Sequence, residues 1–392
     1  MLLLGKNLNS INETDIQSLV DGEVSEGKNI EFKRELPGNS DSNRKEFLAD
    51  VSSFANASGG HLIYGINESE GIANEITGLT ISNIDSEKLR LESIIRDGIA
   101  PRIPGLKIHS IKLENTKDVI ILEIPKSWAM PHMIIFKDHS RFYSRKSAGK
   151  YILDVAELRA AFVLSESIGI QIQNFRTERL GKILSGESII PINEIPKTVF
   201  HIIPFNAFDK TKYIFDNSSL RVIEQSRKDF RPLESTSWNG RYNLDGYVVH
   251  DTLASGNPKS YTQFFRNGII ELVECSLLEP IEDNKIIPGK YYEKQLIDQL
   301  QKYLEFLETM GVETPLLVML TLTGVLDYFI PNGSRISRQH TIDRDTLFLP
   351  EIIIEQHNIN PSKAMKPIFD ALYNASGFNS STSYNTDGEW IE

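Results

Sequence analysis

Near the N-terminus, the pattern of apolar and polar positions predicts a strand, a helix and a second strand. Residues 30–33, Ile-Glu-Phe-Lys, alternate between apolar and charged side chains, which is typical of a half-buried strand. Apolar residues then recur three and four positions apart over residues 43–57, which predicts a helix, and Gly59-Gly60 follows as its end. Residues 61–66 form a short apolar run typical of a strand. The first strand therefore carries an acid and a base on one face.

The remainder of the first half also alternates between helix and strand patterns. The helix after the first strand has three alternative caps, Asp41, Ser42 and Asn43. Residues 70–80 are mostly polar and predict a connector. Further helices are expected over residues 12–20, 85–99 and 155–165, and further strands over residues 106–113, 118–124 and 140–143. Together these elements predict one α+β domain over residues 1–168.

The second half of the chain predicts another α+β domain. The pattern loosens over residues 169–195, where a helix at 174–184 predicts a helical linker. Residues 196–374 then alternate between strand and helix patterns, and residues 375–392, rich in Ser, Asn, Thr and Gly, predict a flexible tail. Strands are expected over residues 198–205, 242–250, 261–274 (a hairpin turning at Asn267-Gly268) and 316–327, and helices over 291–310 and 362–374.

Composition narrows the class of protein. The chain of 392 residues is 40% hydrophobic and 24% charged, as in ordinary globular proteins. It has one cysteine, Cys275, and no apolar run long enough for a signal peptide or a membrane span, so we expect a cytoplasmic protein with no membrane partner. Metal sites built from several cysteines are excluded, and none of the eight histidines has a metal-ligand spacing.

Charge is distributed unevenly along the chain. The formal net charge is −11, yet residues 101–150 contain ten Lys and Arg against four Asp and Glu. Part of this excess alternates along one expected strand with an aromatic residue, which favours phosphate contact and base stacking, although a solvated sheet face explains it equally well. The predicted nucleic-acid-binding residues are Lys137, Arg141, Tyr143, Arg145 and Lys146.

Glu31-Phe32-Lys33 is an acid-x-Lys unit of the kind that metal-dependent nucleases use. A carboxylate there holds a divalent cation, and the lysine orients water or stabilises the phosphate. Magnesium prefers oxygen ligands, and Glu26 and Glu68 are the natural additional donors. The alternative is a solvated ion pair between Glu31 and Lys33 on an exposed strand face, worth about 0–1 kcal/mol.

Several motifs together resemble the Schlafen/AlbA-like domain. They are the Glu-x-x-x-x-Glu-Phe-Lys run of residues 26–33, the helix end Ser-Phe-Ala-Asn-Ala-Ser-Gly-Gly at 53–60, the strand Leu-Ile-Tyr-Gly-Ile at 62–66 and the late Arg-Phe-Tyr-Ser-Arg-Lys at 141–146. They occur in the family's order and spacing. The resemblance covers about residues 12–165, less than half of the chain, and implies a mixed sheet with flanking helices.

In the nuclease-active Schlafen branch three carboxylates form the site, and these positions fall on Glu26, Glu31 and Glu68. Here the turn after the second strand reads Gly-Ile-Asn-Glu, so its first acid has become the amide Asn67 and its second a longer carboxylate. The resemblance implies a metal-dependent endoribonuclease that uses Mg or Mn and acts on structured RNA such as tRNA, with DNA a weaker expectation. Lys33 would position water or phosphate. A role in antiviral defence fits the same family.

Two alternatives to the nuclease stay open. Many family members only bind nucleic acid, so the domain is alternatively a non-catalytic nucleic-acid-binding or regulatory module. Others bind ATP, but this chain lacks G-x-x-x-x-G-K-[S/T]. Schlafen nucleases arrange two related lobes around an RNA groove, and no second Glu-x-x-x-x-Glu-Phe-Lys unit occurs here. We therefore expect a homodimer, with the second half as a groove wall, a dimerisation surface or a partner-docking module.

Overall fold

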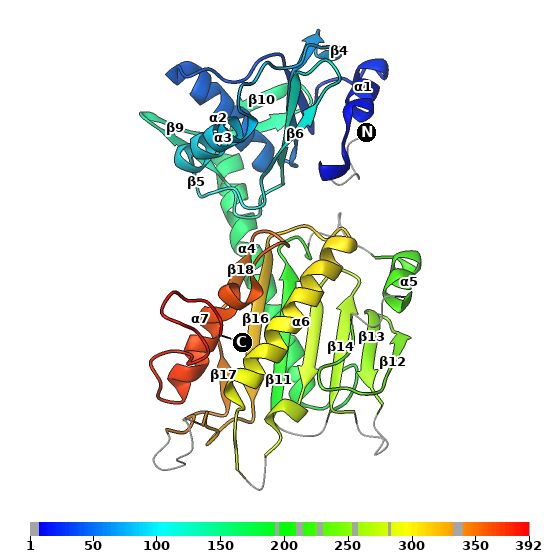
Figure 1. Cartoon of the computed structure of the whole chain (residues 1–392), viewed down its shortest axis with the longest axis vertical. Helices are drawn as coiled ribbons and strands as arrows, with labels where there is room; N and C mark the ends of the chain where they lie inside the picture. Colours follow the sequence, from blue (N-terminus) through cyan, green and yellow to red (C-terminus); the bar gives the residue numbers. More distant parts are fainter. Residues whose placement is uncertain are drawn as a thin grey trace. The chain divides into compact units, whose positions relative to one another are not determined.

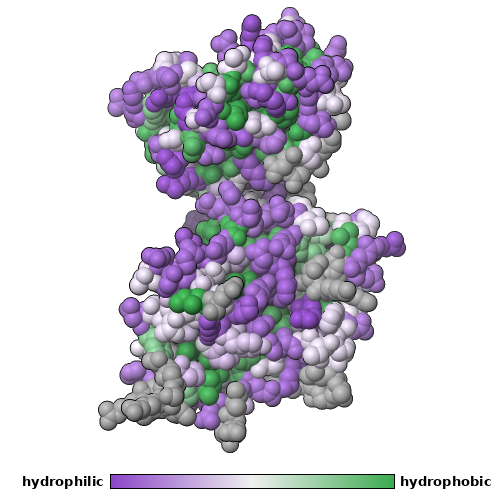
Figure 2. All heavy atoms as spheres, in the orientation of Figure 1, coloured by the Kyte–Doolittle hydropathy of each residue, from purple (hydrophilic) through white to green (hydrophobic). Residues whose placement is uncertain are grey.

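The protein divides into two compact units in a computed structural model (Figure 1). The units are residues 1–169 and 170–392, where the sequence predicted a first domain ending at 168 and a second beginning at 196. The structure describes residues 8–192, 196–208, 215–225, 230–252, 258–280, 284–331 and 340–391. Figure 2 shows that hydrophilic side chains cover most of the visible face of each unit, with smaller hydrophobic groups between them.

The N-terminal unit contains two four-stranded sheets and a hairpin. The first sheet has the order β1-β2-β7-β6 and is mixed, because β1 and β2 are parallel while the other pairs are antiparallel. The second has the order β10-β9-β8-β5. The strands are β1 (Ile30–Lys33), β2 (Gly60–Tyr64), β3 (Ile66–Ser69), β4 (Ile72–Ile76), β5 (Ile99–Ala100), β6 (Lys107–Lys112), β7 (Asp118–Ile124), β8 (Met133–Phe136), β9 (His139–Lys146) and β10 (Gly149–Ile152). The expected mixed sheet with flanking helices is confirmed.

Helices cover both faces of the first sheet. The helices are α1 (Glu13–Asp21), α2 (Asp41–Ala55), α3 (Ile84–Gly98) and the first part of α4 (Val155–Leu184), after a 3-10 turn at Leu8–Ser10. One core cluster joins the sheet to α2 and α3, and a second joins Phe32 and its neighbours to α1. Phe32 therefore faces α1, and Glu31 and Lys33 face the side of the sheet that α2 covers.

A serine caps the start of α2, and two glycines follow its end. Its cap is Ser40, whose Oγ accepts a hydrogen bond from the Asn43 N–H at 3.2 Å, so none of the three caps expected from the sequence is correct. The chain leaves the helix through Gly59, which has a φ of +69°. A Cβ on Gly60 would lie 2.4 Å from the Asn29 carbonyl oxygen, so only glycine fits where β2 starts beside β1.

The C-terminal unit is built on one antiparallel sheet with the order β12-β13-β14-β15-β11-β16-β17, and β18 also pairs with β16. One large core cluster fills the face covered by α6 and α7 (Figure 1), and the second part of α4 packs on the other face. The elements are β11 (Lys197–Pro204), α5 (Asn217–Gln225), β12 (Trp238–Tyr242), β13 (Gly246–Asp251), β14 (Ser260–Phe265), β15 (Ile270–Glu274), a 3-10 turn (Ser276–Leu278), α6 (Gly289–Thr309), β16 (Leu316–Thr323), β17 (Thr346–Phe348), β18 (Ile352–Ile354) and α7 (Pro361–Ala375). The expectation of a second α+β domain is confirmed.

Three segments differ from the sequence expectation. The connector expected at residues 70–80 contains β4, which pairs with β3. The segment predicted as a linker, residues 169–195, contains the second part of α4, which packs on the C-terminal sheet. The tail expected at residues 375–392 is packed, since Ser381 Oγ and Trp390 Nε1 both donate to the buried Glu293 carboxylate, at 2.6 and 3.2 Å. Within the described ranges, every helix is too short or too polar to cross a bilayer.

Candidate functional site

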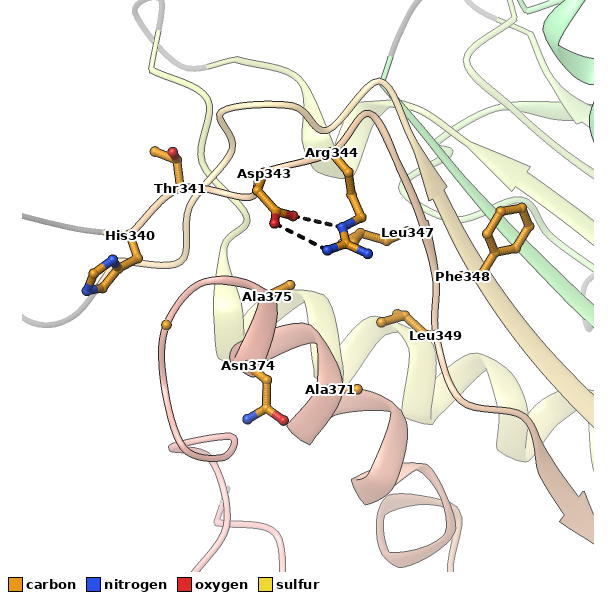
Figure 3. Close-up of a pocket in the computed structure, with 11 residues that line it drawn as sticks. His340, Thr341, Asp343, Arg344, Leu347, Phe348, Leu349, Ala371, Asn374 and Ala375 are labelled. Carbon is orange, nitrogen blue, oxygen red and sulfur yellow. Dashed lines mark hydrogen bonds and ion pairs between the residues drawn. The ribbon is translucent and has the colours of Figure 1, made fainter.

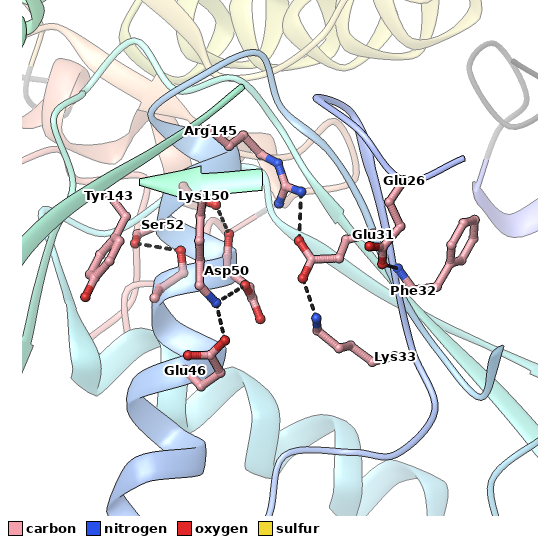
Figure 4. A network of polar contacts seen from close by, with 12 residues as sticks. Glu26, Glu31, Phe32, Lys33, Glu46, Asp50, Ser52, Tyr143, Arg145 and Lys150 are labelled. Carbon is pink, nitrogen blue, oxygen red and sulfur yellow. Dashed lines mark hydrogen bonds and ion pairs between the residues drawn. The ribbon is translucent and has the colours of Figure 1, made fainter. Parts of the chain in front are cut away.

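Glu31 is buried beneath α2 and held by two cations (Figure 4). Its Oε1 lies 2.5 Å from Lys33 Nζ, and its Oε2 lies 2.7 Å from Arg145 Nη2. The side chain of Glu31 is 11% exposed, whereas that of Lys33 is 36% exposed. Burial alone would raise the pKa of Glu31, but Lys33 and Arg145 outweigh it and lower the pKa. The pair Glu31–Lys33 is therefore part of a buried network and not a solvated surface pair.

Arg145 differs most from its expected place. We predicted that it would share an exposed face of β9 with Arg141 and Tyr143, and that placement is wrong: its side chain is 2% exposed. Arg141, Tyr143 and Arg145 do lie on one face of β9, but α2 packs against that face. The end of the face that carries Arg145 is therefore buried, while the end that carries Arg141 is exposed. The Arg145 guanidinium lies 3.7 Å from the centre of the Phe54 ring, and Nη2 also donates to the Gly27 carbonyl at 3.1 Å. Its Nε and Nη1 have no hydrogen-bond partner among the described residues.

A second ion pair lies beside the first. Lys150 Nζ on β10 is 2.5 Å from Asp50 Oδ1 and 2.5 Å from Glu46 Oε1, both on α2. Burial and the neighbouring Glu31 raise the pKa of Asp50 to about 6, against the opposing effect of Lys150 and Lys33. We did not predict Asp50 from the sequence. The sequence does contain a sign of its burial: Asp50 follows Phe47 by three residues and precedes Phe54 by four, so its carboxyl lies on the apolar face of the helix.

These residues form one charged cluster: Glu31, Lys33, Asp50, Arg145 and Lys150. The cluster joins β1 and α2 to the β9–β10 hairpin. Burial alone would lower the pKa values of Lys33 and Lys150, but the carboxylates around them, above all Asp50, raise both. The pKa shifts of Glu31, Lys33 and Lys150 therefore favour their charged forms, whereas the raised pKa of Asp50 increases its proton affinity.

The other two predicted metal ligands have separate partners. Glu26 Oε1 accepts a hydrogen bond from the Phe32 N–H at 2.8 Å, and the exposed Glu68 Oε2 accepts one from the Gly71 N–H at 2.6 Å. Among the residues that the structure describes, no three His, Cys, Asp or Glu side chains are placed to hold a metal ion. Since both oxygens of Glu31 also face cations, this arrangement does not fit Mg or Mn, and we derive no step through a metal. The metal and the catalytic roles of Glu26, Glu31, Lys33 and Glu68 stay predictions.

The remaining predicted nucleic-acid-binding residues lie toward the solvent. Lys137, Arg141 and Lys146 are exposed, and Tyr143 is half-buried. Lys137 is bonded to Asp41, and Lys146 lies 3.8 Å from Glu157. No described residue pairs with the Arg141 guanidinium. Four of the five predicted residues are therefore at least partly accessible.

Asn56, at the end of α2, fixes this basic strand to the rest of the unit. Its amide nitrogen donates to the carbonyls of His132 and Tyr143, at 2.9 and 2.8 Å, and its oxygen accepts from the His132 N–H at 2.7 Å. The sequence showed Asn56 only as one letter of the Ala-Asn-Ala-Ser-Gly-Gly motif. Its physical role is to bind β8 and β9 to the helix.

The C-terminal unit has a pocket of about 500 Å³ between the chain around residues 340–349 and the end of α7 (Figure 3). Its charged side chains, Asp343 and Arg344, bond to each other at 2.7 and 3.2 Å. Both are exposed, so this ion pair is weak. The pocket supplies no group that we can assign to chemistry.

Residues 26–154 match the model of the family described as Schlafen, AlbA_2. The N-terminal unit contains a Schlafen AlbA_2 domain. The match begins at Glu26 and ends just after β10, so it includes the whole charged cluster. It covers less than half of the chain and none of the C-terminal unit. No curated protein matched the chain.

Two solved structures are similar to part of the chain at low levels. One is the DIP2311 protein from Corynebacterium diphtheriae, with 18% identity, a TM-score of 0.25, and 36% of this chain and 30% of that chain covered. The other is the N-terminal domain of a RecG-related protein from Nitrosomonas europaea, provisionally named an ATP-dependent DNA helicase. It has 20% identity, a TM-score of 0.27, and 35% of this chain and 88% of that chain covered. The match thus spans less than a third of the first structure, and we base no functional argument on either.

Proposed function

We propose that the Schlafen AlbA_2 domain binds nucleic acid through the exposed side chains of β9 and its flanking turns. The observation that carries this proposal is the accessible basic edge formed by Lys137, Arg141 and Lys146 in a region of positive charge balance. Arginine and lysine side chains supply phosphate contacts, which dominate the affinity of proteins for nucleic acids. Arg141 is the strongest candidate because no described residue competes for its guanidinium.

The charged cluster has a supporting role in this proposal. Arg145 and Lys150 connect the β9–β10 hairpin to β1 and α2, so the basic strand is presented on a rigid base. Buried ion pairs of this kind position elements well even where their net contribution to stability is small. The domain then acts as a non-catalytic binding module, with RNA as the first partner to test and DNA as the second.

Salt dependence tests the proposal directly. Fluorescence anisotropy with labelled RNA should show an affinity that falls steeply with salt, and Arg141→Gln or Lys146→Gln should each reduce the slope of log K against log salt by about 1. Lys294→Gln is a matched control, because Lys294 pairs with Asp298 on α6 in the other unit. Binding that is insensitive to salt, or equal losses in all three variants, would contradict the proposal.

A metal-dependent endoribonuclease of Schlafen type, acting on structured RNA such as tRNA, is the second candidate. One observation favours it: burial raises the pKa of Glu26, and Glu31 and Glu68 raise it further, so the three carboxyls lie within electrostatic reach of one another. Loading a cation would first require Lys33 and Arg145 to release Glu31.

Incubation of the full chain with a tRNA pool, with Mn, Mg or a chelator, separates the two candidates. Cleavage that requires metal and is lost in Glu26→Ala and Glu31→Ala, while RNA binding is retained, supports the nuclease. Binding without cleavage supports the module. The homodimer also stays a proposal, and a strictly monomeric species in sedimentation at micromolar concentration would overturn it.

A further inference from the structure

Two aromatic side chains of β9, His139 and Tyr143, form a stacked pair outside the charged cluster, and Tyr143 also packs at the margin of the first core cluster. The rings of His139 and Tyr143 are inclined by only 18°, with their centres 6.0 Å apart. His139 Nε2 and the Tyr143 hydroxyl are 3.1 Å apart, within hydrogen-bond distance. Both residues are only half-buried, so part of each ring is open to solvent.

Arg141 lies between His139 and Tyr143 in β9, two residues from each, so alternation places its side chain on the same face of the strand as the two rings. After burial, the charges of Lys45 on α2 and of Arg141 on β9 lower the pKa of His139, so both act on the imidazole. Neither cation has a bonded acid among the described residues. Asp41, the acid nearby on α2 whose pKa Lys45 and Arg44 also lower, is bonded to Lys137. The rings therefore lie near two cations that have no ion-pair partner among the described residues.

We propose that His139, Tyr143, Lys45 and Arg141 form a subsite for one nucleotide of a single-stranded segment, with the base on the rings and the phosphate on the two cations. This inference rests on the proposed nucleic-acid binding and adds to it a preference for single-stranded over duplex nucleic acid. Exposed aromatic rings next to a basic path are the usual platform for single strands, because every unpaired base presents a stacking face. The bases of a duplex are already stacked and paired, so a duplex could use only the cations.

The test uses the full chain and two labelled ligands, a 12-nucleotide single strand carrying 2-aminopurine and the duplex of the same sequence. Tyr143→Leu and His139→Leu should each weaken single-strand binding about tenfold, the size of one lost stacking contact, and reduce the quenching of 2-aminopurine. Duplex binding should change less than twofold. Tyr143→Phe keeps the ring and should bind the single strand within twofold of the unmodified protein, while Arg141→Gln should weaken both ligands.

The outcomes separate this inference from the proposed function. If the unmodified protein binds neither ligand, the proposed function fails and the inference fails with it. If it binds the single strand but the leucine variants bind as tightly, or if saturating protein leaves 2-aminopurine unquenched, the inference alone is overturned. Circular dichroism checks that each variant is folded, and if Tyr143→Leu is not, His139→Leu and the quenching by the unmodified protein decide the question.

Discussion

Glu31 shows how the covering of a strand face decides the role of a side chain. Alternation along β1 places Glu31 and Lys33 together, opposite Phe32. Because α2 and the β9–β10 hairpin cover that face, the carboxylate is desolvated and requires two cations. The same triplet on an uncovered strand would be a weak surface pair.

Removing the charge of Glu31 should destabilise the protein by more than the loss of a surface ion pair would. Glu31→Gln leaves Arg145, which is 2% exposed, without its carboxylate, and breaking a buried pair in this way costs about 3 kcal/mol. Urea unfolding measures the change. Glu123→Gln is the matched control, because Glu123 faces Lys107 at 3.9 Å on the surface and should cost about 0.5 kcal/mol. Similar losses in both variants would mean that Glu31 is not buried in solution.

Asp50 should give the protein a pH dependence of opposite sign to that of an ordinary paired carboxylate. Its pKa is raised to about 6, so between about pH 4 and pH 6 the folded state holds a proton that the unfolded state has released, and stability falls as pH rises. Asp50→Asn removes this titration. Its Tm relative to the unmodified protein should therefore rise from about pH 4.5 to pH 7, whatever constant cost the loss of the Lys150 pair adds.

Asp41→Asn is the control for that measurement. The hydrogen bond from Lys137 lowers the pKa of the exposed Asp41, so the unmodified protein gains stability as pH rises through the usual range of an aspartate. The relative Tm of this variant should fall slightly as pH rises toward about 4 and stay flat between about pH 4.5 and pH 7. A trend of the same sign in both variants would contradict the assignment for Asp50.

At the scale of single residues, the local sequence pattern predicted where a residue lies along its strand better than it predicted which elements surround that residue. The sequence placed Glu31, Lys33 and the alternation of Arg141, Tyr143 and Arg145 correctly along their strands. It did not show that α2 lies over that face of β9, because this depends on contacts between segments about 90 residues apart. For the same reason Arg145 was expected at the surface, and Asp50 was not singled out.

Asn56 helps to hold β8 and β9 on α2, beside the contacts of Phe54 with Arg145 and of Asp41 with Lys137. It makes three hydrogen bonds to the backbone of His132 and Tyr143, within a buried region where water cannot replace them. Asn56→Ala should cost about 2 kcal/mol, because buried backbone groups lose their partners. Hydrogen exchange measured by mass spectrometry should become faster in β8 and β9.

Asn39→Ala provides the comparison for that experiment. The Asn39 side chain is exposed and accepts only a 3.5 Å contact from Arg90, so its loss should change stability by less than about 0.5 kcal/mol. If exchange in β8 and β9 is the same in both variants, Asn56 does not hold the hairpin.

Elements with a long periodic pattern of apolar residues were predicted correctly. A strand that forms only because it pairs with a neighbouring strand was missed. The helix expected at 291–310 is α6, and the hairpin turning at Asn267-Gly268 joins β14 to β15. By contrast, β4 is only five residues long and has one buried residue, Ala73, and its strand character comes from pairing with β3. The chain from Val155 to Leu184 was divided into two helices because its apolar pattern loosens after residue 165, yet it is one helix.

At the scale of the whole molecule, each unit has its own core and its own buried ion network. In the C-terminal unit, Glu271 accepts two hydrogen bonds from Arg179, each 2.8 Å long, and one from Tyr261 at 2.8 Å, and lies 3.0 Å from His201 Nε2. Burial alone would raise the pKa of Glu271, but Arg179 and His201 lower it to about 2. This network connects the second part of α4 to the centre of the sheet.

Glu271→Gln should therefore affect one unit selectively. It leaves Arg179 buried without its carboxylate and should cost about 3 kcal/mol. Hydrogen exchange should become faster in β11, β14 and β15, with no change in β1, β2 or β9, since both partners of the pair lie in the C-terminal unit. Glu178→Gln, which removes an exposed pair with Lys182, is the control. Faster exchange across both units would show that the chain unfolds as one cooperative body.

The ion pair between Glu31 and Arg145 has a consequence for how relatives of this protein can diverge. It unites the Glu-Phe-Lys triplet with the late Tyr-x-Arg strand, two signatures more than a hundred positions apart, into one electrically balanced unit. An acid lost from the first leaves an orphan cation under the helix, while replacement of both by apolar side chains of similar volume is tolerated. In a family tree of this domain the two positions should thus be inherited as a couple, and surviving lineages should hold either both charges or neither.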